Sequence, residues 1–150
     1  MTSSLTPIIY FSGLDRSGKS TTRKEFAVKT NQKYFTWDRS FVDNIVYDEA
    51  FRNIRLSELE IKEVIERFTN AKNVYIVHMV LSIEEVNRRT KVSEGSEYPV
   101  NELLLCSKLF YKYFQYASHY GAKVIRVECD NKTVDEIVSE IVTTIEGVTK

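Results

Sequence analysis

Apolar and polar residues alternate along the chain in two distinct patterns. Four short runs consist almost entirely of apolar and β-branched residues, and the longer stretches between them have apolar positions that recur every three or four residues. The first pattern is typical of strands buried on both faces, and the second is typical of amphipathic helices. The predicted strands are residues 7–12, 33–37, 73–81 and 122–128.

Three of the predicted helices begin at a Ser or Thr that is followed three residues later by Glu. This spacing satisfies the first backbone N–H groups of a helix. The pairs are Ser57 with Glu60, Ser82 with Glu85, and Thr133 with Glu136. Further helices are expected from about Gly18 to Lys29, through 41–51, and from about Val100 to Tyr120. The helix after Ser82 is expected to reach Arg88 and Arg89, where the polar stretch 90–99 interrupts the pattern.

The alternation of strands and helices predicts the fold class. It favours a single α/β domain over residues 1–150, with a parallel sheet of about four strands and helices on both faces. The carboxyl ends of parallel strands meet at one edge of a sheet, where ligands bind. We therefore expect Gly13, Asp38 and the segment after Leu81 to converge. We also expect strand 33–37 to pair beside strand 7–12.

Composition narrows the function classes. The chain has 21 Lys and Arg against 21 Asp and Glu, so it has no overall basic field of the kind that attracts nucleic acid. Its amino terminus has no basic region and only a short apolar run, so we expect no signal peptide and no membrane partner. The expected location is the cytoplasm, or the host cytoplasm if the chain is viral. A homodimer is left open.

The stretch "GLDRSGKST" (13–21) has the spacing G-x-x-x-x-G-K-S of a phosphate-binding loop. It follows a predicted strand and opens a predicted helix, which is the context that such a loop requires. Its glycines allow a tight turn that points N–H groups at phosphate oxygens, and the helix adds its positive end. Lys19 would reach the β- and γ-phosphates and the Ser20 hydroxyl would ligate Mg²⁺. The predicted ligands are ATP and Mg²⁺. The predicted nucleotide-binding residues here are Gly13, Leu14, Asp15, Arg16, Ser17, Gly18, Lys19, Ser20 and Thr21.

Three further residues suggest what is done with the nucleotide. Arg16 lies inside the loop, where it would stabilise charge on a transferring phosphate as an arginine finger does, unless it points to solvent. Asp38 and Arg39 directly follow a strand. The carboxylate would hold Mg²⁺ or accept a proton, and the guanidinium would bind an acceptor phosphate. The catalytic candidates are thus Arg16, Lys19, Asp38 and Arg39, and the metal candidates are Ser20 and Asp38.

Four segments together resemble the thymidylate-kinase-like group of P-loop kinases, with deoxynucleoside and deoxynucleoside monophosphate kinases as close relatives. "FSGLDRSGKSTT" resembles the phosphate loop of that group, and "DRSFVDNIVY" its Asp-Arg segment. "SIEEVNRRTKVSEGSEY" is similar to the passage from a strand to a lid, and "NELLLCSKLFYKYF" to the helix after the lid. The resemblance implies that Asp15 contacts the acceptor sugar, Arg16 the transferring phosphate and Arg39 the acceptor. It also implies that Arg88 or Arg89 contacts the donor from the lid.

The sequence departs from that group in two places. His78 stands where relatives often have an acid, and we interpret it as a core histidine. Only a short connection joins the first helix to the strand before Asp38, where relatives place another strand and helices that hold the acceptor. The chain thus resembles a short, virus-type member in which the acceptor pocket lacks one wall.

Two acceptors remain open at this point. The resemblance favours a deoxynucleoside monophosphate, with thymidylate first. The missing wall favours a polynucleotide or a hydroxymethylated base within DNA (the 5-hydroxymethyluracil type), as in phage DNA modification. A non-kinase nucleotide switch is the lesser alternative, because the sequence has no D-x-x-G outside the phosphate loop and no N-K-x-D tetrad.

Overall fold

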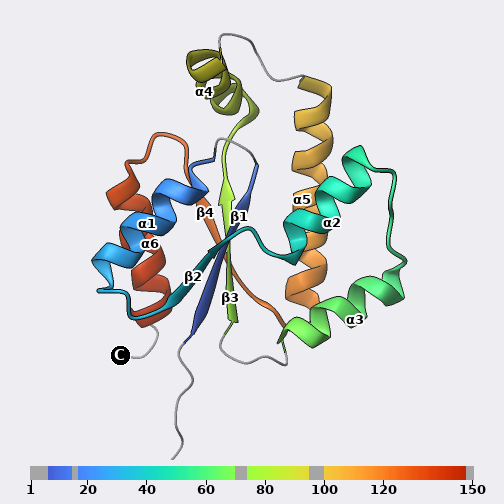
Figure 1. The fold of residues 1–150 in the computed structure, drawn as a ribbon, viewed down its shortest axis with the longest axis horizontal. Coiled ribbons are helices and arrows are strands. Elements are labelled where there is room, and N and C mark those ends of the chain that lie inside the picture. The colour runs from blue at the N-terminus through green and yellow to red at the C-terminus, as the bar shows by residue number, and fades with distance from the viewer. Residues whose placement is uncertain (1–6, 15–16, 70–73, 95–99, 148–150) are drawn as a thin grey trace, which may run out of the picture.

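Strands and helices alternate along the chain as the sequence predicts. The computed structural model describes residues 7–14, 17–69, 74–94 and 100–147. The elements in these ranges (Figure 1) are β1 (Ile8–Gly13), α1 (Lys19–Lys29), β2 (Phe35–Asp38), α2 (Phe41–Phe51), α3 (Glu58–Thr69), β3 (Val74–Val80), α4 (Ile83–Glu94), α5 (Val100–His119), β4 (Lys123–Glu128) and α6 (Val134–Gly147). Each predicted strand is confirmed, with bounds shifted by one or two residues.

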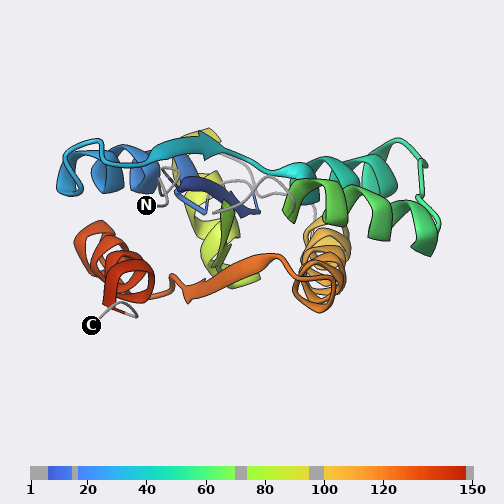
Figure 2. The same cartoon turned by 90° about the horizontal axis from the view of Figure 1, so that it is seen from below.

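The strands form one parallel sheet in the order β2-β1-β3-β4. The predicted pairing of β2 beside β1 is confirmed, and its register places Phe11 opposite Asp38. Figure 2 shows the sheet nearly edge-on, with α1 and α6 on one face and α2, α3 and α5 on the other. Helix α4 lies beyond the carboxyl ends of the strands (Figure 1). The predicted α/β fold with helices on both faces is therefore confirmed.

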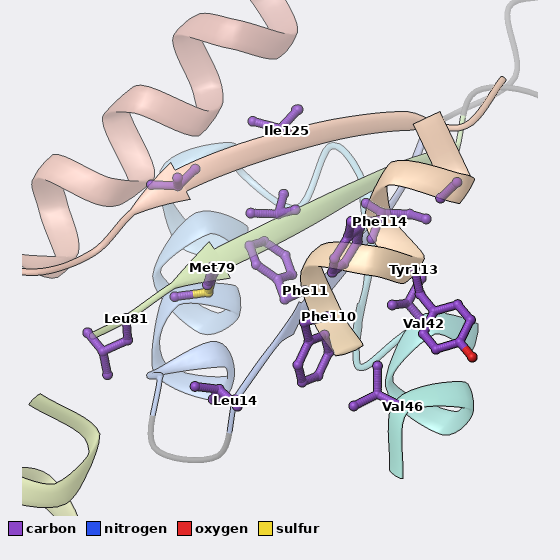
Figure 3. Packing of buried hydrophobic residues seen from close by; sticks show 14 of the residues in the cluster. Phe11, Leu14, Val42, Val46, Met79, Leu81, Phe110, Tyr113, Phe114 and Ile125 are labelled. Carbon is purple, nitrogen blue, oxygen red and sulfur yellow. The ribbon is translucent and has the colours of Figure 1, made fainter. Parts of the chain in front are cut away.

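Aliphatic and aromatic side chains together form the core of the protein, part of which is drawn in Figure 3. Phe11 of β1 packs edge-on against Phe26 of α1, with 5.7 Å between ring centroids. On the opposite face the ring of His78 stacks on Phe114 of α5, at 4.1 Å. Burial, followed by the charge of Arg126, lowers the pKa of His78 to about 4, so the ring is neutral at physiological pH. These contacts agree with the interpretation of His78 as a core residue.

Two of the three predicted capping boxes are complete, and the third is not. The Ser57 and Thr133 hydroxyls accept from the backbone N–H groups of Glu60 and Glu136, whose carboxylates accept in return. At the start of α4 the Ser82 hydroxyl accepts from Glu85 N–H at 3.2 Å, but Ser82 N–H donates to Asp130 at 2.9 Å. The Glu85 carboxylate is therefore available for other partners.

Helix α4 continues past Arg89 to Glu94, so the prediction that the polar stretch interrupts the helix is wrong for residues 90–94. Thr90 is only 1% exposed, and its hydroxyl donates to the carbonyl oxygen of Val86 at 2.9 Å. Because the preceding turn satisfies this hydroxyl, a polar residue can be buried within the helix. Residues 95–99 lie outside the described residues. No helix in the described ranges is long and apolar enough to cross a membrane.

The packing of α1 on the sheet gives a test of the core. Phe26 is fully buried and Val28, two residues away on the same helix, is 68% exposed. We predict that Phe26→Ala lowers the free energy of unfolding by about 3–5 kcal/mol, because it leaves a cavity, whereas Val28→Ala changes it by about 0.5 kcal/mol or less. Urea denaturation measures both values. Equal losses in the two variants would contradict this placement of α1.

Candidate active site

The two sequence signals converge on one cleft at the carboxyl edge of the sheet. Strands β1 and β2 are neighbours that end at Gly13 and Asp38. These are also the first residues of the phosphate-loop motif and of the Asp38–Arg39 pair. The cleft has a volume of about 280 Å³ and is lined by Ser17, Gly18, Lys19, Ser20, Thr21, Asp38 and Arg39. The phosphate loop (residues 13–21) and the Asp38–Arg39 pair therefore face the same space. Asp15 and Arg16 lie outside the described residues.

The two glycines of the loop are needed for different reasons. Gly13 has φ 148°, and a Cβ added there would lie 2.5 Å from the carbonyl oxygen of Met79, which is too close for any other residue. Gly18 has φ 89°, a left-handed conformation that side chains rarely adopt. Gly13 thus lets the loop leave β1 in contact with β3, and Gly18 lets it enter α1.

The ammonium group of Lys19 is bound to backbone carbonyl groups at the start of the phosphate loop. This group donates to the carbonyl oxygens of Gly13 and Leu14, at 2.7 and 3.1 Å. These carbonyl groups belong to the last residue of β1 and to the residue after it, so the lysine connects the first turn of α1 to the end of the strand. A cation in this place can bind a phosphate oxygen without a large movement of the backbone.

The first turn of α1 is electrostatically suited to an anion. The helix begins after Gly18 with no side-chain cap, and its first turn contains no acidic residue. Every other helix in the described ranges has at least one Asp or Glu in its first turn. The N–H groups and the positive end of α1 are therefore not neutralised by a carboxylate of that turn. Together with Lys19 and the glycine turns, this end of α1 fits a polyphosphate.

Asp43 is a buried carboxylate that the sequence reading missed. It is 0% exposed, and its Oδ1 accepts from Ser40 N–H at 2.8 Å as part of the capping box of α2. Its Oδ2 accepts from Gly13 N–H at 3.5 Å. Burial raises the pKa of Asp43, while the charge of Lys19 and hydrogen bonds from Ser12, Ser40 and Gly13 favour the ionised form. Asp43 thus joins the start of α2 to the phosphate loop.

Asp38 and Arg39 line the cleft together with the first turn of α1. The Asp38 carboxylate accepts from Arg23 Nε at 3.1 Å, in a pair whose side chains are 29% and 38% exposed. A pair this exposed is weak, so Asp38 can exchange Arg23 for another cation. Arg39 is exposed and has φ 70°, and its backbone N–H donates to the carbonyl oxygen of Phe11 at 2.7 Å. The chain therefore turns sharply into the cleft after β2.

The cleft offers ligands for Mg²⁺ in Ser20 and Asp38. Among the described residues no group of three or more His, Cys, Asp and Glu side chains could hold a metal ion alone. Mg²⁺ is commonly held by one or two protein ligands together with substrate phosphates, and this donor set fits that arrangement. The hydroxyl and the carboxylate both line the cleft next to Lys19.

The two lid arginines have different environments. Both pair with Glu85, whose pKa is lowered to about 2 by hydrogen bonds from Arg88 and then Arg89. The Arg88 side chain is 63% exposed and that of Arg89 is 31% exposed. A Cβ added at Gly18 would lie 3.7 Å from Nη1 of Arg89. Of these two arginines, the structure thus places Arg89 against the phosphate loop.

The fold is shared with solved structures. The chain is similar to the YorR protein from Bacillus subtilis in complex with phosphorylated GDP, with a TM-score of 0.75 and 19% identity over 95% of this chain and 97% of that one. It is also similar to thymidylate kinase from Candida albicans, with a TM-score of 0.67 and 16% identity over 99% of this chain and 94% of that one. No protein-family model and no curated protein matches the sequence. At these identities the likeness establishes the fold alone, which this chain shares with YorR and thymidylate kinase.

The contact of Asp43 with the loop gives a second test. Asp43→Ala removes the acceptor for the N–H groups of Ser40 and Gly13, so we predict a loss of about 1–3 kcal/mol in the free energy of unfolding. Asp48→Ala is the matched control on α2, because the Asp48 side chain forms a surface ion pair with Arg52, and its loss should cost about 0.5 kcal/mol. Urea denaturation of both variants at neutral pH measures the difference. An Asp43→Ala variant no less stable than the control would contradict the bridging role.

Proposed function

We propose that the chain is an ATP-dependent kinase that transfers the γ-phosphate of ATP to a deoxynucleotide-type acceptor. The observation that carries this proposal is the single cleft lined by both the phosphate loop and Asp38–Arg39. The fold shared with thymidylate kinase and with YorR, which was solved with phosphorylated GDP, supports the proposal. ATP and Mg²⁺ are the cofactors that this residue set would use.

Four residues of the cleft, together with Arg89, have roles in this proposed reaction. Lys19 and the first N–H groups of α1 would bind the donor phosphates, and Ser20 with Asp38 would hold Mg²⁺, which would offset the negative charge of those phosphates. The acceptor oxygen forms a bond to the γ-phosphorus while the bond to the β,γ-bridging oxygen breaks, and ADP leaves. A proton lost by a hydroxyl acceptor goes to water, because Asp38 serves the metal in this arrangement. Arg39 positions the acceptor, and Arg89 binds the donor from the side of α4.

A nucleotide switch explains fewer of these residues. A switch needs the phosphate loop but has no use for an acceptor-binding arginine at the end of β2. The backbone of Asp38 and Arg39 is also held beside the end of β1, through β1–β2 pairing and the hydrogen bond from Arg39 N–H to Phe11. This arrangement favours a kinase, in which donor and acceptor must be oriented together.

Two kinds of acceptor are consistent with the cleft. A deoxynucleoside monophosphate such as thymidylate is the default for this fold. A polynucleotide, or a hydroxymethylated base within DNA, is favoured by one specific observation. Among the described residues β2 is the edge strand of the sheet, so no further strand in these ranges forms a wall on its side of the cleft.

Transfer of label from radiolabelled ATP tests the proposed activity. With Mg²⁺ and a panel of nucleosides, nucleoside monophosphates and DNA with ordinary or hydroxymethylated bases, we predict a labelled acceptor. Lys19→Ala should abolish transfer, because it removes the charge that balances the β- and γ-phosphates. Lys24→Ala, an exposed lysine on the same helix, should retain it. Release of free phosphate with no labelled acceptor in the panel would instead support the nucleotide switch.

Arg16 gives a separate prediction from the sequence. If it stabilises the transferring phosphate, Arg16→Ala should lower kcat by ~10³ or more and barely weaken ATP binding, because the contact forms mainly in the transition state. Steady-state kinetics gives kcat, and equilibrium titration with a non-hydrolysable ATP analogue gives the affinity. Full turnover in Arg16→Ala would show that this arginine is not a finger in cis.

A further inference from the structure

We propose that Phe35 and Trp37, on the edge strand β2, bind bases of single-stranded DNA. The bound DNA then places its acceptor group in the cleft. The inference rests on the proposed function, because it names the class of acceptor for the same site. The two side chains are 64% and 59% exposed, although both are large and aromatic. They are separated by one residue on the outermost strand of the sheet.

The register shows that both rings lie on one face of the sheet. The side chains of Thr36 and Asp38 both contact Arg23 of α1, at 3.5 and 3.1 Å, so they point to the α1 face. Because side chains alternate along a strand, Phe35 and Trp37 point to the opposite face. There Trp37 is the neighbour of Tyr10, whose ring packs against Phe68 of α3 at 5.0 Å. Figure 2 shows α2, α3 and α5 on this side of the sheet, with β2 at its outer edge.

Folding of the chain does not account for this pair. Neither ring has an aromatic or hydrogen-bonding partner among the residues that the structure describes, unlike Tyr10 and Phe41 beside them. Exposed aromatic residues on an unpaired edge strand promote aggregation, and edge strands usually carry charged residues instead. Their presence at this edge is therefore explained better by a ligand than by packing.

The spacing of the rings fits an unstacked single strand. Two residues along a strand span about 6.6 Å. Stacked bases rise by only about 3.4 Å per nucleotide, so a duplex cannot place successive bases on both rings. Aromatic side chains on exposed strands bind the faces of separated bases without sequence preference. The spacing of Phe35 and Trp37 thus suits a single DNA strand whose neighbouring bases are not stacked on each other.

The position of the pair connects it to the cleft. Trp37 directly precedes Asp38 and Arg39, which line the cleft together with Lys19. Exposed cations stand at both ends of the strand: Arg39 follows it, and Lys33, whose side chain is 63% exposed, precedes it. Lys33 pairs with Glu146 at the surface, and such pairs are weak enough to yield to a phosphate. A DNA strand bound along β2 therefore has its next nucleotide, the one past the base on Trp37, beside the donor phosphates.

The fluorescence of Trp37 measures this binding directly, because it is the only tryptophan of the chain. We expect a short oligodeoxythymidylate to quench the emission of the full chain in a saturable way, and thymidylate at the same nucleotide concentration to quench it much less. Phe35→Ala should weaken the oligonucleotide affinity by ~5–100-fold, the loss of one stacked base. Leu59→Ala, which removes a side chain 64% exposed on α3, is the control and should leave the affinity unchanged.

The outcomes separate this proposal from the proposed function. Quenching that depends on Phe35, with label transferred from ATP to the oligonucleotide or to modified DNA, supports both. Absence of quenching, or label on free nucleotides only, overturns the proposal that single-stranded DNA is the acceptor. Label on free nucleotides still supports the proposed kinase activity. Quenching with no labelled acceptor at all supports the DNA-binding surface and contradicts the kinase. A shift of Trp37 emission with protein concentration alone, matched by a dimer in sedimentation, would assign this edge to a second copy of the chain.

Discussion

The candidate site depends on the hydrogen-bonded pairing of β2 with β1. This pairing sets Asp38 opposite Phe11, two residues before Gly13, so the phosphate loop and the Asp38–Arg39 pair leave the sheet side by side. The backbone hydrogen bond from Arg39 to Phe11 extends the pairing by one residue beyond β2. A shift of register by one residue would turn Asp38 away from the α1 face, because side chains alternate along a strand. The chemistry of the cleft is therefore fixed by a contact within the sheet.

Buried polar groups reinforce this contact from beneath the cleft. The Ser12 hydroxyl donates to that of Ser40 at 2.7 Å, and Asp43 accepts from the backbone on both sides of the cleft. Buried polar networks of this kind are costly unless every member is paired, so they specify one arrangement of the segments that they join. The capping box of α2 thus helps to position the phosphate loop as well as to begin a helix. A change in the conformation of the phosphate loop would therefore alter the start of α2, and the reverse also holds.

The sequence predicted the elements well, because their signals are local. Continuous apolar runs mark the strands, the capping pairs mark helix starts, and alternation fixes a parallel sheet. Asp43 was not predicted, because "DNIVY" contains nothing to distinguish a buried carboxylate from an exposed one. The choice of Arg89 over Arg88 depends on the direction in which α4 crosses the loop, which adjacent residues in a sequence cannot show. The continuation of α4 through Thr90 depends on a hydrogen bond that buries a polar side chain. The roles of Asp15 and Arg16 stay predictions.

We propose that the phosphate loop and Asp38–Arg39 form one nucleotide site. Peptide-resolved hydrogen exchange with and without a non-hydrolysable ATP analogue and Mg²⁺ tests this claim most directly. We expect slower exchange at residues 13–21 and, in the same titration, at residues 38–40, because both segments border the bound phosphates and their metal. Protection of the loop with no change at residues 38–40, or protection of neither segment, would contradict it.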